Sequence, residues 1–212
     1  SSTLFYSCKD NPVTLTPEGF KWQLSDSLPG EYIEGMYAPD LYTLYYFNIS
    51  SCYKTLYGAK TKIDFGDATF RVVAMNAFSP TYTAFIGTSG TPTSRVTLKI
   101  INNGIVTTAL LDSNPTALSS NVLILQPGKI IFSFGKKLHL YDNGTITTYL
   151  PESKDDTFYR LVNTDNVIYL SAFTLPGGSK IYKFENNVLS LIATQTSGNI
   201  NMQVDDFMLK SD

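Results

Sequence analysis

Residues 138–150 read LHLYDNGTITTYL, and the fold follows from this stretch. Two runs rich in apolar residues and threonine flank an Asn-Gly pair. Asn-Gly readily adopts the positive φ angles of a two-residue primed turn, which matches the twist of paired strands. The stretch therefore predicts a β-hairpin.

The same pattern recurs along the chain. Residues 98–110 read LKIINNGIVTTAL, and residues 181–192 read IYKFENNVLSLI. Gly66-Asp67 and Asp10-Asn11 are candidates for two further turns of this series. Successive turns then lie about 37 to 55 residues apart, close to the roughly 40 to 50 residues of one propeller blade.

Further strands are predicted between the hairpins, at residues 121–125, 129–134, 157–162 and 167–172. Two extra strands per hairpin complete a four-stranded blade. Several of these runs, and also residues 41–47, are apolar on both faces, as expected for strands packed between two neighbouring sheets. Residues 200–204 and 207–209 are predicted to supply strands that join the amino-terminal hairpin, so that both termini would close one shared blade.

In period and turn chemistry the chain resembles the β-propeller repeat proteins, of the general kind represented by kelch and tachylectin-like propellers. It lacks the Gly-Gly and Trp signature that recurs in each kelch blade and the Trp-Asp of WD blades. The resemblance implies an all-β fold, a small β-propeller of about five four-stranded blades, formed as a single domain over residues 1–212. The alternative is a β-sandwich, or two small β domains with a boundary near residues 79–91.

Composition excludes two classes of partner. The 212 residues carry 16% charged residues and a net charge of −2, with no long basic run, so we expect no nucleic-acid partner. No stretch approaches the roughly 18 consecutive apolar residues of a membrane span, so we expect no membrane insertion. The 13% aromatic content predicts a folded chain.

Cysteines and glycosylation sequons favour a location outside the cytoplasm. Cys8 and Cys52 are the only cysteines and allow one disulfide, although two free buried thiols remain the alternative. Asn48 and Asn143 head acceptor sequons for N-glycosylation. The sequence therefore predicts a secreted, cell-surface or virion protein.

Catalytic and metal signatures are weak. His139 alternates with leucines and has no nucleophile or acid at a telling spacing, which favours a packed or surface histidine. One His and two separated Cys do not make a zinc site, and we expect no cofactor. Asp155-Asp156 fits solvated turn acids better than a calcium loop.

An enzymatic alternative comes from the sialidases. Propeller sialidases hold an acidic sugar with three arginines, and this chain has Arg71, Arg95 and Arg160. The Asn-Gly turns resemble the Asp-box turns of those enzymes but lack the leading Ser and closing Trp. Arg71 is also expected on an outer strand, away from a central pocket.

The loops are the remaining functional elements, because a rigid β frame presents them for recognition. Tyr, Asn and Ser bind through ring contacts and adaptable hydrogen bonds. We therefore predict a non-enzymatic binding or structural assembly module that engages protein or glycan, alone, as a homo-oligomer or within a larger particle. A carbohydrate-binding lectin is the alternative. The candidate binding residues are Tyr53, Tyr57, Asp112, Asn114, Asp155 and Asp156.

Overall fold

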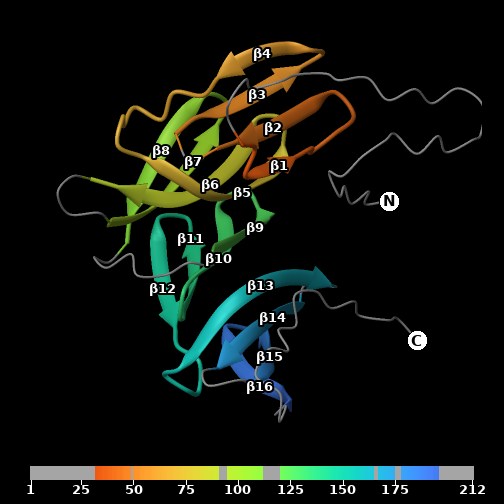
Figure 1. The fold of residues 1–212 in the computed structure, drawn as a ribbon, viewed down its shortest axis with the longest axis vertical. Helices are drawn as coiled ribbons and strands as arrows, with labels where there is room; N and C mark the ends of the chain where they lie inside the picture. The colour runs from red at the N-terminus through yellow and green to blue at the C-terminus, as the bar shows by residue number, and fades with distance from the viewer. Residues whose placement is uncertain are drawn as a thin grey trace, which may run out of the picture. The chain divides into compact units, whose positions relative to one another are not determined.

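The computed structural model describes residues 32–48, 50–90, 95–111, 120–164, 167–174 and 178–195 (Figure 1). These residues form an all-β structure. They contain no helix that is long and apolar enough to cross a membrane.

The strands of the described residues form four antiparallel sheets, each with four strands. Sheet A contains β1 (Gly35–Tyr37), β2 (Thr43–Phe47), β3 (Cys52–Leu56) and β4 (Ala59–Lys62). Sheet B contains β5 (Arg71–Ser79), β6 (Tyr82–Ser89), β7 (Arg95–Asn102) and β8 (Ile105–Leu110). Sheet C contains β9 (Ser120–Gln126), β10 (Lys129–Phe134), β11 (Lys137–Asp142) and β12 (Thr145–Tyr149). Sheet D contains β13 (Asp156–Thr164), β14 (Val167–Thr174), β15 (Ser179–Glu185) and β16 (Val188–Gln195).

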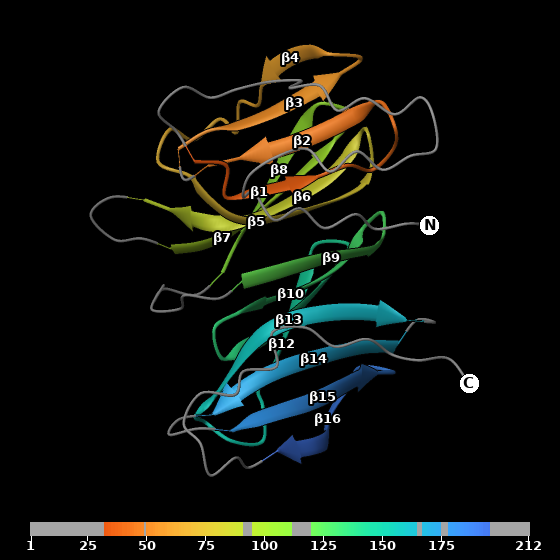
Figure 2. The ribbon, with the colours of Figure 1, turned by 45° about the vertical axis from the view of Figure 1, so that its right-hand side comes forward.

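Every sheet is a meander in which each strand pairs with the next one in sequence (Figure 2). The first strands of neighbouring sheets contact each other, β1 with β5, β5 with β9 and β9 with β13. This repetition of four-stranded units is the arrangement expected of propeller blades. The hairpins predicted around residues 103, 143 and 186 are confirmed as the third and fourth strands of sheets B, C and D.

The prediction of a hairpin at Gly66-Asp67 is wrong. The corresponding turn of sheet A lies at Tyr57-Gly58, between β3 and β4. Residues 63–70 instead connect sheets A and B, because their polar groups bond locally: Gly66 N donates to Asp64 Oδ1 at 2.8 Å. The suggested domain boundary at residues 79–91 is also wrong, since β5 and β6 pair across its start.

The predicted fifth blade lies outside the described residues, because the turn at Asp10-Asn11 and the strands at 200–204 and 207–209 belong to it.

The prediction of two-sided burial is confirmed in β10. Ile130 and Phe132 pack in a hydrophobic cluster with sheet B, whereas Ile131 packs in a cluster with sheet D. Side chains alternate between faces along a strand, so β10 contributes to both cores.

Candidate functional site

The β3–β4 turn departs from the rule that the other sheets follow. In sheets B, C and D the first turn residue is an asparagine with positive φ: Asn103, Asn143 and Asn186. In sheet A this position is Tyr57, with a φ of 50°. Asparagine tolerates left-handed backbone, but a bulky aromatic residue is strained there. The β3–β4 turn of sheet A therefore carries backbone strain that the corresponding turns of sheets B, C and D avoid.

Tyr57 belongs to an exposed apolar cluster, which we call the tyrosine tip: Leu41, Tyr42, Leu56 and Tyr57. Leu41 is 94% exposed and Tyr57 is 76% exposed. The rings of Tyr42 and Tyr57 lie with centroids 4.9 Å apart, and Tyr57 N donates to Tyr42 O at 3.1 Å. The tip therefore presents ordered aromatic and aliphatic side chains to solvent.

Asp40 fixes the loop that carries Leu41 and Tyr42. Its Oδ1 accepts hydrogen bonds from Tyr42 N at 2.8 Å and Thr43 N at 2.7 Å. The bond from Tyr42 N contributes most to lowering the pKa of Asp40. A carboxylate thus lies directly beside the tip.

Tyr53 lies away from the tip. It is half-buried in β3, where its ring stacks on Tyr46 with centroids 5.5 Å apart. Lys60 Nζ lies 4.5 Å from the centroid of the same ring. The structure therefore separates the two predicted binding tyrosines: Tyr57 is presented to solvent and Tyr53 packs on its own sheet.

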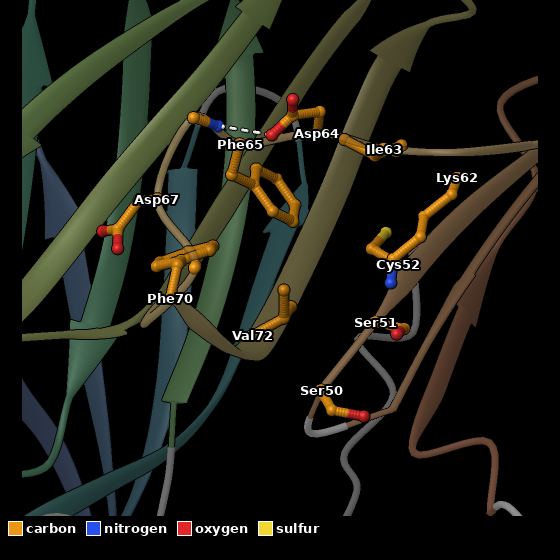
Figure 3. A pocket seen from close by; sticks show the side chains of 12 residues that line it. Ser50, Ser51, Cys52, Lys62, Ile63, Asp64, Phe65, Asp67, Phe70 and Val72 are labelled. Atoms are coloured by element: carbon orange, nitrogen blue, oxygen red, sulfur yellow. Dashed lines mark hydrogen bonds between the residues drawn. The ribbon is translucent and has the colours of Figure 1, made fainter.

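A cleft of about 760 Å³ opens between sheet A and the connection to sheet B (Figure 3). One wall comes from β3 and β4, with Cys52 and Lys62, and the other carries Phe65, Phe70 and Val72. The described residues that line it are Ser50, Ser51, Cys52, Lys62, Ile63, Asp64, Phe65, Gly66, Asp67, Ala68, Phe70 and Val72. The cleft has an apolar floor and a polar rim, and sequence reasoning missed it because one wall comes from β3 and β4 and the other from the connection to β5.

Cys52 lines this cleft as a buried thiol whose pKa is raised by burial to about 12. A thiol with so high a pKa is almost entirely protonated at neutral pH and is a poor nucleophile. Cys8 lies outside the described residues, so the disulfide with Cys52 stays a prediction.

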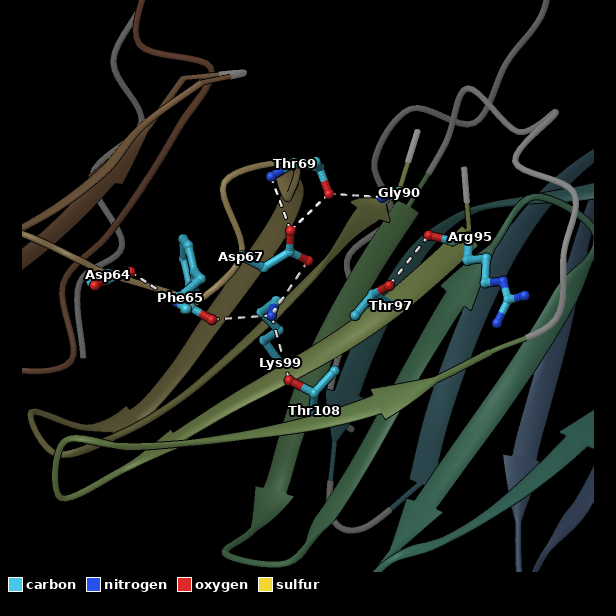
Figure 4. Close-up of polar contacts among 10 residues, drawn as sticks. Asp64, Phe65, Asp67, Thr69, Gly90, Arg95, Thr97, Lys99 and Thr108 are labelled. Carbon is cyan, nitrogen blue, oxygen red and sulfur yellow. Dashed lines mark hydrogen bonds and ion pairs between the residues drawn. The ribbon is translucent and has the colours of Figure 1, made fainter. Parts of the chain in front are cut away.

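Asp67, part of the lining of the cleft, forms an ion pair with Lys99 (Figure 4). Lys99 is buried in β7, and its Nζ lies 3.7 Å from Asp67 Oδ2. It also donates to Phe65 O at 3.1 Å and Thr108 Oγ1 at 3.4 Å. The Thr69 hydroxyl donates to Asp67 and holds the pKa of that carboxyl below its usual value. These contacts tie the connection between the sheets to β7.

A second polar network surrounds Asp156, and here the prediction of a solvated turn acid is wrong. Asp156 is 0% exposed, while Asp155 is exposed. Lys180 Nζ lies 2.9 Å from both carboxylate oxygens, Thr174 Oγ1 donates to Oδ1, and Tyr182 Oη donates to Oδ2. Burial opposes ionisation, but these hydrogen bonds outweigh it and keep the pKa of Asp156 below its usual value.

His139 is packed, as predicted. It is 5% exposed, stacks on Phe132 with ring centroids 5.0 Å apart, and its Nδ1 lies 3.0 Å from Thr148 Oγ1. Lys99 and Tyr182 occupy the same position, four residues before the turn, in sheets B and D. The three aligned hairpins therefore share a buried polar side chain at this position of the third strand.

The two sequons differ in access. Asn48 is 5% exposed, and its Oδ1 accepts hydrogen bonds from Ser50 N and Ser51 N. Asn143 is exposed in its turn. Burial disfavours a glycan at Asn48, and the use of either sequon stays a prediction.

The remaining sequence candidates lie on several different strands or outside the described residues. Asp112 and Asn114 lie outside them. Arg71 begins β5, the first strand of its sheet. The first strands contact the first strands of the neighbouring sheets, so the expectation that Arg71 lies on an outer strand is wrong. Arg95 begins β7 and Arg160 lies in β13. Within the described ranges no group of three or more His, Cys, Asp or Glu side chains is placed to hold a metal ion.

Comparison with known proteins supports the architecture. No family model matches the chain, and no curated protein matches it. Among solved structures, an oligogalacturonate lyase in complex with manganese superimposes with a TM-score of 0.52 at 8% identity, over 73% of this chain and 51% of the lyase chain. That lyase is a β-propeller protein. This chain has a propeller-like fold.

A second β-propeller structure, YCF48 bound to D1 peptide, matches with a TM-score of 0.39 at 11% identity, over 76% of this chain and 66% of that one. The chain thus spans about half the length of the lyase and about two thirds of YCF48. At such low identity the likeness to the lyase concerns the fold and not the chemistry.

Proposed function

We propose that this chain is a non-enzymatic binding and assembly module that engages a protein partner through the tyrosine tip. The observation that carries the proposal is Tyr57, an exposed aromatic residue at a φ of 50° where three equivalent turns have asparagine. Strained backbone costs about 1–3 kcal/mol and clusters at functional sites. Because the strained Tyr57 is mostly exposed, its ring adds little to the core, and we infer that it is kept for contact with a partner.

The composition of the tip favours a protein over a glycan. Tyrosine dominates protein interfaces because its large ring orders at low entropic cost. Leu41 and Leu56 surround the tyrosines with aliphatic surface, which fits an apolar protein pocket. A sugar site instead needs several hydrogen-bonding groups to match the hydroxyls.

We place this module on an extracellular or virus-particle surface. Few charged residues, a net charge of −2 and an exposed sequon at Asn143 support that location. A surface that relies on Ser, Thr, Asn and Tyr for its polarity is compatible with many weak contacts to neighbouring proteins.

The proposal includes a ring of about five blades closed by both termini. Tyr169 and Ile181 support it, because these half-buried residues lie on the face of sheet D opposite the core shared with sheet C. A fifth sheet would cover such a face.

Dyes placed at residues 2 and 211 should show strong energy transfer in the native chain and lose it on unfolding. Weak transfer in the native chain would exclude closure.

Replacing Tyr57 by Asn should stabilise the chain while weakening binding. Asparagine removes the strain of left-handed backbone at tyrosine but also loses the ring contact with Tyr42, so we expect the free energy of unfolding to rise by only about 1 kcal/mol, the low end of the strain. Loss of the ring should reduce captured protein at least tenfold, which corresponds to about 1.4 kcal/mol. Denaturant unfolding measures the first effect. An array of secreted, surface and cytoplasmic proteins, with this chain itself as one spot, measures the second.

The matched control is Ile105→Ser, which removes an exposed apolar side chain beside the equivalent turn of sheet B. It should leave binding unchanged. A glycan array probed in parallel tests the lectin alternative. Glycan signals with no protein signal, or protein signals confined to cytoplasmic proteins, would refute the proposed function.

A further inference from the structure

We propose that the tyrosine tip of one copy of this chain inserts into the cleft of a second copy, in a head-to-tail contact. This inference rests on the proposed function and names the partner of the tip. Its ligand is therefore a second copy of this chain.

The two surfaces lie at opposite ends of the same hairpin. Cys52 and Lys62 stand at the cleft end of β3 and β4, whereas Leu56 and Tyr57 stand at the tip end. Five residues of extended strand span about 16 Å. A tip on one copy can therefore enter the cleft of another while the cleft of the first copy remains free.

Their shapes and polarity match. The tip projects two tyrosines and two leucines into solvent, and the cleft offers about 760 Å³ between its walls. Phe65, on the floor of the cleft, is half-buried and meets the rings of Phe70 and Phe85 edge-on, with centroids 4.8 and 4.9 Å apart. Tyrosine rings of a second copy would extend this aromatic cluster, and aromatic pairs stabilise contacts beyond the area they bury.

Charges match as well. Asp40, beside the tip, has a lowered pKa and is ionised at neutral pH, and Lys62 is exposed on the rim of the cleft. Of the two carboxylates in the described lining, Asp67 is paired with Lys99 at 3.7 Å, whereas Asp64 is exposed. The orientation that sets Asp40 beside Lys62 and away from Asp64 is therefore the favoured one. A net charge of −2 on 212 residues gives little repulsion between copies.

A contact between two different surfaces is heterologous, so it leaves one free tip and one free cleft on every dimer. Growth then continues into rows or closes into a ring. An isologous dimer, in which two tips face each other, would stop at two copies. This difference makes the proposal testable by mixing.

The test uses one variant for each surface of the full chain. The tip variant is Leu41→Ser with Tyr57→Asn, and the cleft variant is Lys62→Glu with Ala68→Arg, which reverses the rim charge and fills the cleft from an exposed position. The controls are Ile105→Ser and Lys154→Glu, the latter an exposed charge reversal in the connection between sheets C and D. Circular dichroism and thermal unfolding establish that all variants are folded.

Light scattering after size exclusion then measures mass against concentration. We expect the wild type and both controls to increase in mass with concentration, and each variant alone to remain at the mass of one chain. An equimolar mixture of the two variants should reach twice that mass and no more, because only one tip and one cleft survive in each pair.

Three results would overturn the inference: a wild type that stays monomeric at all concentrations, single variants that still assemble, or a mixture that stays monomeric. The array separates this failure from failure of the proposed function. Capture of a different secreted protein that is lost in Tyr57→Asn, with no signal at the spot of this chain, supports the function and refutes self-assembly. Tip-independent capture refutes both.

Discussion

Replacing Asp156 by Ala should lower the free energy of unfolding by about 3–5 kcal/mol, the range for breaking a buried ion pair from one side. The carboxylate is fully buried, and its removal leaves the Lys180 ammonium, only 15% exposed, without its counter-charge. The Tyr182 hydroxyl also loses its acceptor. Equilibrium unfolding in denaturant at neutral pH measures the change.

Asp155→Ala is the matched control, because it removes the same side chain one position earlier. Asp155 is exposed, and its ion pair with Lys136 spans 4.0 Å, so the expected change is within about 0.5 kcal/mol. Double replacement with Asp156→Ala and Lys180→Met should recover part of the loss, since no unpaired charge remains. Equal effects of Asp155→Ala and Asp156→Ala would show that the network does not stabilise sheet D.

The burial of Asp156 could not be predicted from the sequence, whereas the hairpins could. A primed turn is specified by two adjacent residues, so Asn-Gly and Asn-Asn reveal it locally. The partners of Asp156 lie 18 to 26 residues further along the chain. Only the pairing of β13, β14 and β15 brings them together.

Sheet A shows the limit of the turn rule. Tyr57-Gly58 carries no Asn or Asp signal, so the sequence pattern favours the nearby Gly66-Asp67 instead. Tyrosine at this φ is unfavourable on local grounds, and positions where local preference fails are expected to be functional or strained. The residue that caused the wrong turn prediction is the residue on which the proposed function rests.

The polar residue four positions before the turn recurs visibly in the three hairpin sequences, but its burial in all three sheets was not predicted. Lys99, His139 and Tyr182 align in the three hairpin stretches. The alternation of side chains along a strand does not show which of its two faces is buried, so the burial of all three residues could not be predicted. Packing of each sheet against its neighbours decides that. The cleft was unpredictable for a similar reason, because folding alone brings the connection at residues 63–70 against β3 and β4.

The stability of the chain should fall as pH decreases from about 6.5 to about 4, because His139 must remain neutral in the folded state. Burial, aided by the charge of Lys137, lowers the pKa of His139 to about 4, against about 6.5 in an unfolded chain. Between these values the unfolded state binds the proton and the folded state does not, so protonation favours unfolding. Above pH 6.5 the penalty is absent, and below pH 4 it is complete at about 3 kcal/mol.

The single histidine of the chain makes this prediction unusually direct. The imidazole proton resonances report its pKa without assignment, and denaturant unfolding at a series of pH values reports the stability. His139→Phe preserves the ring stacked on Phe132 and removes the titration, so the stability of the variant relative to the wild type should rise by about 3 kcal/mol between pH 7.5 and pH 4. Carboxylates titrate in both proteins and cancel in this difference. An imidazole pKa near 6.5 in the folded chain, or a difference that does not change with pH, would mean that His139 is not held in a dry environment between sheets B and C.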